Sequence, residues 1–250
     1  MNSPGNRRHE ARNASIRRTL FFDIDGTLLH VRGAGRAAFA SAVRDEFGVT
    51  DDLQWVRFAG ATDLDVLRQV LERHGGTAAE ERIARFFSRL AASLREHLTA
   101  APPELCPGAR ELLTALARDE TTLIGLITGN TGPCARIKLE AAGIHGHFVL
   151  GAFGHEHGNR AEIARLALDR AFHHGMPRDA TCVVIGDTPL DIAAARAIGA
   201  RALSVATGAH SEAELRAAGA DHVIVDFSDT ASVLAWLMSD AHTSPPRETA

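Results

Sequence analysis

Six short apolar runs, with helix-like segments between the later ones, constrain the fold of this sequence more than any other feature. Several runs are almost continuously apolar, which is typical of strands buried on both faces of a parallel sheet. Alternation of strands and helices predicts an α/β protein whose parallel sheet is covered by helices on both faces. The predicted strands are Leu20–Phe22, Leu123–Ile127, Phe148–Leu150, Cys182–Ile185, Ala202–Val205 and Val223–Val225.

The segments between the later runs carry apolar residues at helical spacing. Two of them start with residues at capping-box spacing, Asn159 with Glu162 and Ser211 with Glu214. Three are followed by a glycine, where the end of a helix favours one. The predicted helices are Gly108–Arg118, Gly132–Ala142, Arg160–Phe172, Leu190–Ile198 and Glu212–Ala218.

The stretch from about residue 33 to residue 101 breaks this alternation, because it contains no convincing strand. Glycine-rich and proline-rich segments bracket it like hinges. We therefore predict a helical cap over 33–101, inserted into a core made of 17–32 and 102–239. Its predicted helices are Arg36–Phe47, Leu64–His74 and Ala79–Leu98.

Composition limits the class of protein. A formal net charge of −4, from 27 basic and 31 acidic residues, does not resemble a nucleic-acid-binding protein. Three widely spaced cysteines fit a reducing compartment, and no apolar run is long enough for a signal peptide or a membrane span. We expect a cytoplasmic monomer or homodimer that binds neither nucleic acid nor membrane, with a disordered leader over 1–16 and a polar tail over 240–250.

Acidic residues follow two of the predicted strands directly. Asp23 and Asp25 come after the first, and Asp187 and Asp191 come after Cys182–Ile185. Ligands of open parallel sheets bind outside the carboxyl ends of the strands, so these carboxylates are expected at one edge. Burying close carboxylates costs several kcal/mol unless a cation or a proton compensates, and a hard divalent cation is the natural partner. Each pair also has a purely structural interpretation. In that interpretation, the first strand simply ends in an Asp-Gly turn at Asp25, and Asp191 only stabilises the start of a helix.

Two further strand ends carry polar groups that suit a phosphate. Thr128, Gly129 and Asn130 offer a hydroxyl and backbone N–H groups before a helix, although an ordinary capping turn has the same residues. Arg160 lies in the first turn of a predicted helix, where a cation opposes the helix dipole and hints at a nearby anion. Taken together, these groups predict a site for phosphate and magnesium.

In order and spacing, these motifs resemble those of the haloacid dehalogenase-like superfamily, over roughly residues 18–238. The resemblance is to its phosphatases with a helical cap after the first motif, of the phosphoglycolate phosphatase and β-phosphoglucomutase kind, and it implies a Rossmann-like core. Phe22–Leu28 resembles the first motif, Thr128 the second and Gly186–Asp191 the fourth. The third motif is usually a lysine. We favour Arg160 for that place, because arginine keeps the charge and can bind phosphate through two N–H groups; the only lysine, Lys138, lies in mid-helix and is expected to be exposed.

The resemblance implies a role for each residue. Asp23 attacks phosphorus and becomes an aspartyl phosphate, while Asp25 acts as general acid and then as general base. Mg²⁺ is the implied cofactor, and its implied ligands are Asp23, the backbone carbonyl of Asp25, Asp187 and Asp191. The groups implied to hold the phosphoryl group are Thr128, Gly129, Asn130 and Arg160.

The expected function is hydrolysis of a phosphate monoester of a small phosphorylated metabolite, an acid or a sugar by analogy. A sugar phosphomutase would use the same residues, and a non-catalytic phosphate-binding module is a third reading. In the cap, the turn around Thr62 is either a specificity loop that binds substrate or a simple helix cap. His155 and His157 precede Arg160 in a loop that either contacts substrate or lies on the surface.

Overall fold

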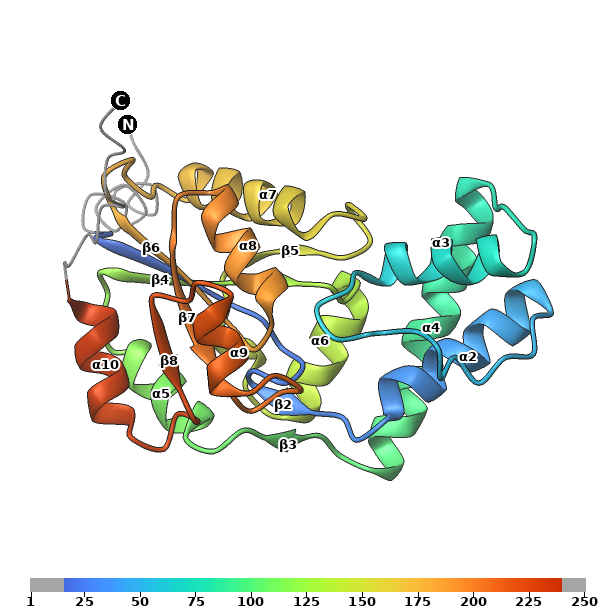
Figure 1. The fold of residues 1–250 in the computed structure, drawn as a ribbon, viewed down its shortest axis with the longest axis horizontal. Helices are drawn as coiled ribbons and strands as arrows, with labels where there is room; N and C mark the ends of the chain where they lie inside the picture. The colour runs from blue at the N-terminus through green and yellow to red at the C-terminus, as the bar shows by residue number, and fades with distance from the viewer. Residues whose placement is uncertain (1–15, 240–250) are drawn as a thin grey trace, which may run out of the picture.

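The structure is a computed structural model that describes residues 16–239. The predicted leader, apart from Ile16, and the predicted tail lie outside the described residues. A six-stranded parallel sheet has the order β5-β4-β1-β6-β7-β8, and helices cover it (Figure 1). This confirms the predicted α/β class. The strands are β1 (Arg18–Phe22), β4 (Thr122–Thr128), β5 (Leu150–Phe153), β6 (Thr181–Gly186), β7 (Arg201–Val205) and β8 (His222–Ile224).

Both faces of the sheet are buried, and alternate residues of the central strand β1 show how. Leu20 and Phe22 pack in one cluster with α5, α6 and α10, whereas Phe21 packs in another with α7, α8 and α9. All three are fully buried, as a central strand of a two-sided sheet requires. The core helices are α5 (Ala109–Leu116), α6 (Gly132–Ala141), α7 (Arg160–His173), α8 (Pro189–Ala197), α9 (Glu212–Ala217) and α10 (Thr230–Met238).

One strand lies later in the chain than predicted. The apolar run Phe148–Leu150 suggested β5, but the strand is Leu150–Phe153, after the short 3-10 helix His145–His147. Val149 is 57% exposed, so the run does not mark a buried segment. The strand itself contains Gly151, which has no side chain, and Ala152, whose side chain is one methyl group, so an apolar pattern does not reveal it.

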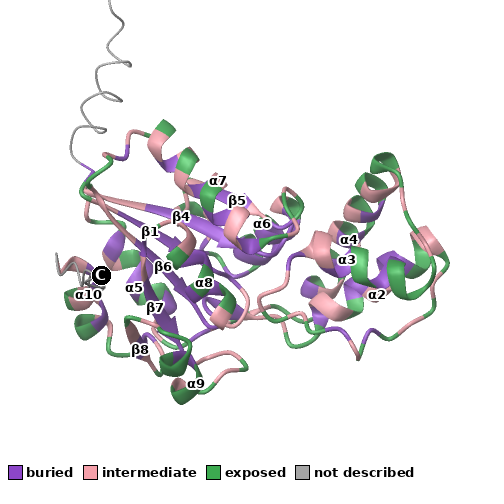
Figure 2. Cartoon of the chain, turned by 45° about the horizontal axis from the view of Figure 1, so that its top comes forward, coloured by how far each residue is buried: buried purple, intermediate pink, exposed green. Residues whose placement is uncertain are grey.

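Three helices lie between two short strands that follow β1, and they form a lobe beside the sheet (Figures 1 and 2). This lobe has its own apolar centre, in which the rings of Phe39 and Phe86 lie 5.0 Å apart. The helices fall within the predicted 33–101, although the division of the chain into cap and core stays a prediction. They are α2 (Ala34–Phe47), α3 (Asp63–Arg73) and α4 (Glu80–Ala100).

The chain enters and leaves this lobe through one pair of antiparallel strands. In the pair, β2 (Leu29–His30) lies beside β3 (Glu104–Leu105), with Leu29 opposite Leu105. With two residues each, these strands are too short for sequence periodicity to reveal. In the part of the chain that the structure describes, no helix is long and apolar enough to cross a membrane.

Polar side chains cap the N-terminal ends of two of the core helices, α9 and α7. The predicted capping box of Ser211 and Glu214 is present at α9. At α7, Asn159 accepts a hydrogen bond from the N–H of Ala161, but Glu162 pairs with Arg165. That helix is therefore capped by Asn159 without the predicted reciprocal contact.

Candidate active site

The sheet brings its first two acidic strand ends together. The chain runs from β1 to β4 and β5 on one side, and then from β6 to β7 and β8 on the other. The adjacent ends of β1 and β6 are therefore the point where the strand order reverses, which is where ligands of such sheets bind. Asp23 follows β1 and Asp187 follows β6, and the N–H of Asp23 donates to the carbonyl of Ile185 at 2.9 Å.

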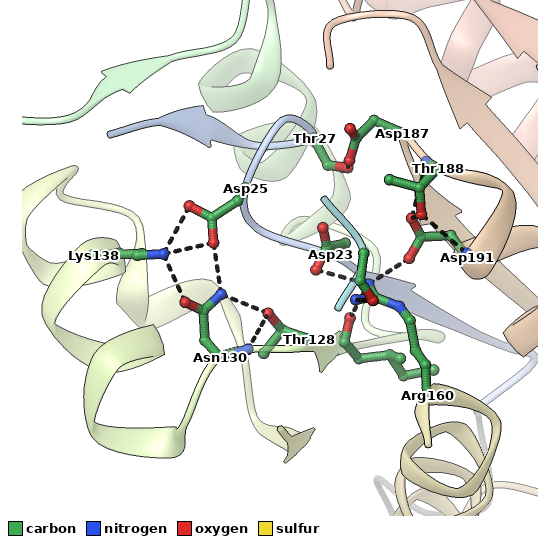
Figure 3. Close-up of polar contacts among 12 residues, drawn as sticks. Asp23, Asp25, Thr27, Thr128, Asn130, Lys138, Arg160, Asp187, Thr188 and Asp191 are labelled. Atoms are coloured by element: carbon green, nitrogen blue, oxygen red, sulfur yellow. Dashed lines mark hydrogen bonds and ion pairs between the residues drawn. The ribbon is translucent and has the colours of Figure 1, made fainter. Parts of the chain in front are cut away.

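Three buried carboxylates meet at this point. Oxygens of Asp23, Asp187 and Asp191 all lie within 4.8 Å of one another, a spacing that could hold a metal ion (Figure 3). Asp191 joins from α8, where Thr188 and Asp191 form a capping box and the Thr188 hydroxyl donates to its carboxylate at 2.7 Å. Thr27 donates to Asp187 at 3.0 Å. Hydroxyl groups thus position Asp187 and Asp191, and the end of β1 positions Asp23.

The electrostatics of the cluster call for an additional cation. Burial raises the pKa of Asp23 to about 6, with Arg160 opposing the shift and the neighbouring aspartates adding to it. Burial likewise raises the pKa of Asp187 to about 8, and Asp191 and Asp23 add to this shift. A single guanidinium among three carboxylates leaves excess negative charge, which a divalent cation would offset.

Arg160 is the cation that the structure places in this cluster. Its Nη2 lies 2.8 Å from a carboxylate oxygen of Asp23 and also donates to Asp191. The same guanidinium donates to the carbonyls of Ile127 in β4, at 3.2 Å, and of Gly60 in the cap, at 3.3 Å. Arg160 therefore links the carboxyl end of the sheet to the lobe of α2, α3 and α4, while its role as the cation of the third motif stays a prediction.

Glycines pack closely around these carboxylates. A Cβ atom at Gly26, whose φ is +80°, would lie 2.5 Å from an oxygen of Asp187, and one at Gly208 would lie 1.7 Å from it. A Cβ at Gly186 would lie 2.1 Å from the carboxyl carbon of Asp191. A side chain at any of these three positions would therefore collide with the acidic groups, so only glycine fits there.

Asp25 points away from the three carboxylates and belongs to a second polar cluster (Figure 3). Its side chain is 39% exposed and accepts hydrogen bonds from Lys138, at 2.6 and 2.8 Å, and from Asn130, at 2.7 Å. Asn130 also donates to the hydroxyl oxygen of Thr128 at 2.8 Å. The site therefore has a carboxylate near its opening that is separate from the buried acidic group.

Lys138 corrects one expectation from the sequence. It is 4% exposed, and its ammonium reaches Asn130 at 2.6 Å as well as Asp25. Burial alone would lower the pKa of Lys138, but the adjacent Asp25 carboxylate raises it above its usual value, so the side chain is charged. The prediction of an exposed lysine was wrong because α6 packs against both lobes. Ala135 and Leu139 face the core cluster, while Cys134 and Ile137 join the cap cluster.

The remaining predicted residues lie at the junction of the two lobes. Gly129 accepts a hydrogen bond from the N–H of Asp63 at 2.8 Å, and Gly129 and Asn130 line the cavity. Thr62 is not among the residues that line it. Its hydroxyl caps α3 by accepting from the N–H of Asp65 and donates to the carbonyl of Gly158 at 3.2 Å, so it has the helix-capping role; its contact with substrate stays a prediction.

The loop before Arg160 is also used structurally. His155 accepts a hydrogen bond from the N–H of Gly132 at 3.3 Å and lies against Phe87 and Phe153. His157 accepts one from the N–H of Asn159 at 2.9 Å. Neither histidine is among the residues that line the cavity.

A cavity of about 540 Å³ opens between the two lobes above these groups. Its floor includes Asp23, Asp25, Asp187 and Arg160, and its opposite wall comes from the lobe of α2, α3 and α4. This volume lies in the range of ~300–1,000 Å³ that is usual for small-molecule sites.

Comparison with known proteins agrees with this geometry. The sequence profile of the haloacid dehalogenase-like hydrolases matches residues 20–196. A protein described as probable phosphatase IndB of Dickeya dadantii is 30% identical over 215 residues, which cover 84% of this chain and 90% of that protein. The phosphoglycolate phosphatase of Rhodospirillum rubrum is 27% identical over 232 residues, which cover 88% and 90%.

Solved structures share the fold. A hydrolase from Pseudomonas syringae superposes with a TM-score of 0.68 at 27% identity, covering 88% of this chain and 99% of that one. CbbY of Rhodobacter sphaeroides in complex with phosphate superposes with a TM-score of 0.65 at 22% identity, covering 86% and 96%. With the profile match over most of the chain, these likenesses show that the protein belongs to the haloacid dehalogenase-like hydrolase family.

Proposed function

We propose that this hydrolase is a Mg²⁺-dependent phosphatase that cleaves a small-molecule phosphate monoester through an aspartyl phosphate at Asp23. The observation that carries the proposal is the cluster of three buried carboxylates at the strand-order reversal, with Arg160 inside it. The phosphatases among the relatives support the same class of reaction. Three points stay predictions. They are that the substrate is a small phosphorylated metabolite, that the protein is cytoplasmic, and that it is a monomer or a homodimer.

The donor set fits Mg²⁺. Asp23 and Asp187 supply hard carboxylate oxygens, the backbone carbonyl of Asp25 completes the expected set, and Asp191 lies within reach of the same point. The raised pKa values of Asp23 and Asp187 show how strongly the buried site disfavours three negative charges without a further cation. When bound, Mg²⁺ neutralises charge on the transferring phosphoryl group.

The side chains divide the reaction between them. An Asp23 oxygen attacks phosphorus, and the bond from phosphorus to the ester oxygen breaks. The departing oxygen takes a proton from Asp25 in its carboxylic acid form, which leaves the Asp25 carboxylate that Lys138 and Asn130 hold. Asp25 then accepts a proton from water as the water oxygen attacks phosphorus, and phosphate leaves with Asp23 restored.

Other groups hold the phosphoryl oxygens during both steps. The Thr128 hydroxyl accepts hydrogen bonds from Asn130, which leaves its own proton available to donate. The backbone N–H of Gly129 follows it at the start of the loop to α6, whereas the N–H of Asn130 already donates to the Thr128 hydroxyl at 3.3 Å. Arg160, fixed by Asp191 and by two backbone carbonyls, offsets negative charge beside Asp23.

The test is phosphate release from a panel of phosphomonoesters, with and without MgCl₂, by wild type, Asp23→Asn and the matched control Asp45→Asn. Asp45 is exposed on α2 and is not among the residues that line the cavity. We expect activity only with Mg²⁺, its loss in Asp23→Asn and its retention in Asp45→Asn. A folded, Mg²⁺-binding protein that hydrolyses no ester would refute the proposal. A stable phosphorylated Asp23 with slow phosphate release would point to phosphoryl transfer to a second substrate instead.

A further inference from the structure

We infer that the alcohol portion of the substrate is apolar, so that the enzyme prefers the phosphate monoester of an alkyl or aryl alcohol to that of a sugar or a hydroxy acid. The inference rests on the proposed function and concerns the wall of the same cavity. It differs from the acid or sugar that analogy suggested.

The wall opposite the carboxylates is built mainly from hydrocarbon. The cap contributes Phe39, Phe58, Val66, Leu90 and Leu94, from α2, α3, α4 and the loop before α3. All but Phe58 are at most 3% exposed, so these side chains are fixed in the apolar centre of the cap. Contact with such a wall favours hydrocarbon over hydroxyl groups, which would lose water without gaining partners.

Cys134 extends this wall from the core side. Burial raises the pKa of its thiol to about 12, so it meets the substrate as a neutral and weakly polar group. It lies one helical turn before Lys138 on α6, and the two residues mark where the apolar wall meets the polar floor.

The cations that line the cavity are already engaged. Lys138 donates to both oxygens of Asp25 and to Asn130, which accounts for its three N–H bonds. Arg36 donates to the carbonyls of Leu53 and Val56, and its guanidinium lies over the ring of Phe58, 4.8 Å from the centroid. A carboxylate on the substrate would have to compete with these partners.

Negative charge near the wall also disfavours an acidic substrate. Asp63 lines the cavity and accepts a hydrogen bond from the N–H of Thr131 at 2.7 Å. Asp25 lies on the floor below it. The two arginines Arg57 and Arg68, which could have offered a cation from the cap, are exposed and are not among the lining residues. Near this wall, the carboxylates of Asp25 and Asp63 would therefore repel a second acidic group, and the cations Lys138 and Arg36 already have hydrogen-bond partners.

The first test measures binding without turnover. Calorimetry on the full-length protein with MgCl₂ would compare methyl-, butyl-, hexyl- and octylphosphonate, which the enzyme cannot hydrolyse to an alcohol. We expect affinity to rise roughly three- to fourfold for each added CH₂ until the wall is covered. Equal affinity along the series would overturn the inference, whether or not the protein is a phosphatase.

The second test compares hexyl phosphate with the ester of the same chain length that ends in a carboxylate. Both are alkyl esters, so their leaving groups are similar and kcat/KM reports on the wall. We expect the carboxylate to lower kcat/KM at least tenfold. Equal or better hydrolysis of the carboxylate, or of a sugar phosphate, would overturn the inference while leaving the proposed phosphatase function intact.

A pair of variants locates the effect. Leu94→Gln adds a polar amide to the wall at similar size, and Leu94→Met is its apolar control. We expect Leu94→Gln to reduce the gain along the phosphonate series and Leu94→Met to retain it. If Leu94→Gln does not fold, the wild-type series still decides; if it folds and keeps the full gain, the wall at Leu94 does not contact the substrate.

Discussion

The contact between the cap and Gly129 gives a quantitative prediction for the variant Gly129→Ala. A Cβ atom at Gly129 would lie 1.9 Å from the carbonyl oxygen of Ala61 and 3.3 Å from the Cα of Thr62. Ordinary contact begins at 3.4 Å, so the cap loop would have to retreat by about 1.5 Å, the difference between 3.4 and 1.9 Å. The φ angle of Gly129 lies outside the left-handed region, so alanine adds no backbone strain of its own.

That retreat would weaken the contacts that seat the cap on the core. The N–H of Asp63 donates to Gly129 at 2.8 Å, and the N–H of Leu64 donates to Gly154 at 3.1 Å. Each such bond contributes about 0.5–1.5 kcal/mol net. A displacement of ~1 Å near reacting groups can cost roughly 100-fold in rate, equivalent to about 2.7 kcal/mol. We therefore expect kcat/KM of Gly129→Ala to fall about 100-fold.

The assay is phosphate release at low substrate concentration, with thermal unfolding to check the fold. Gly132→Ala is the matched control, because its Cβ would meet nothing nearer than 3.6 Å. We expect this control to keep its activity. A Gly129→Ala enzyme within threefold of wild type would refute the argument that this cap contact must be close, and an equal loss in Gly132→Ala would show that the contact is not the cause.

Three further changes test the charges around the site. Arg160→Gln leaves Asp23 and Asp191 without their buried cation, so urea unfolding without Mg²⁺ should show a loss of about 3–5 kcal/mol; an unchanged midpoint would contradict the pairing. Lys138→Met removes the ammonium that holds Asp25, and kcat should fall roughly 10- to 100-fold with little change in melting temperature, whereas an unaltered kcat would dismiss this role. Burial raises the pKa of Asp63 from 3.8 to about 6, so stability from this group is present below pH 3.8 and is lost as the pH rises through 6. Asp63→Asn should therefore gain stability over wild type at pH 7.5, by at most about 3 kcal/mol, and not at pH 3.5; equal differences at both pH values would exclude Asp63 as the source.

Sequence alone could predict the groups that strands deliver to the site. Asp23, Thr128 and Asp187 each end or follow a buried strand, and parallel strands bring such ends to one edge. Arg160 could be predicted because a cation at the start of a helix needs a reason to be there. These predictions depend only on which residues follow a strand or begin a helix, and the apolar pattern of the sequence shows where strands and helices lie.

Lys138 shows what such reasoning could not reach. A helical pattern with one apolar face predicts one buried side, but α6 packs against two apolar clusters, and its exposed surface is confined to positions such as Pro133, Arg136 and Glu140. The spacing of Thr131, Cys134 and Lys138, at three and four residues, places them on one helix face and was a usable signal. Its meaning depended on where the cap lies. The contacts of Thr62 and of Gly129 with residues of the other lobe are equally beyond a local pattern.

The strand pair that joins the two lobes has a consequence for how such an enzyme can diversify. Because β2 and β3 run side by side, with Leu29 opposite Leu105 and His30 opposite Glu104, the chain enters and leaves the lobe of α2, α3 and α4 at points about 4.5–5.5 Å apart. Ends this close let one inserted segment be exchanged for another without shifting any strand of the sheet. In the proposed enzyme, the sheet carries the phosphate chemistry and the lobe contacts the alcohol. Evolution can then replace the lobe, and with it the preferred alcohol, while the sheet stays the same.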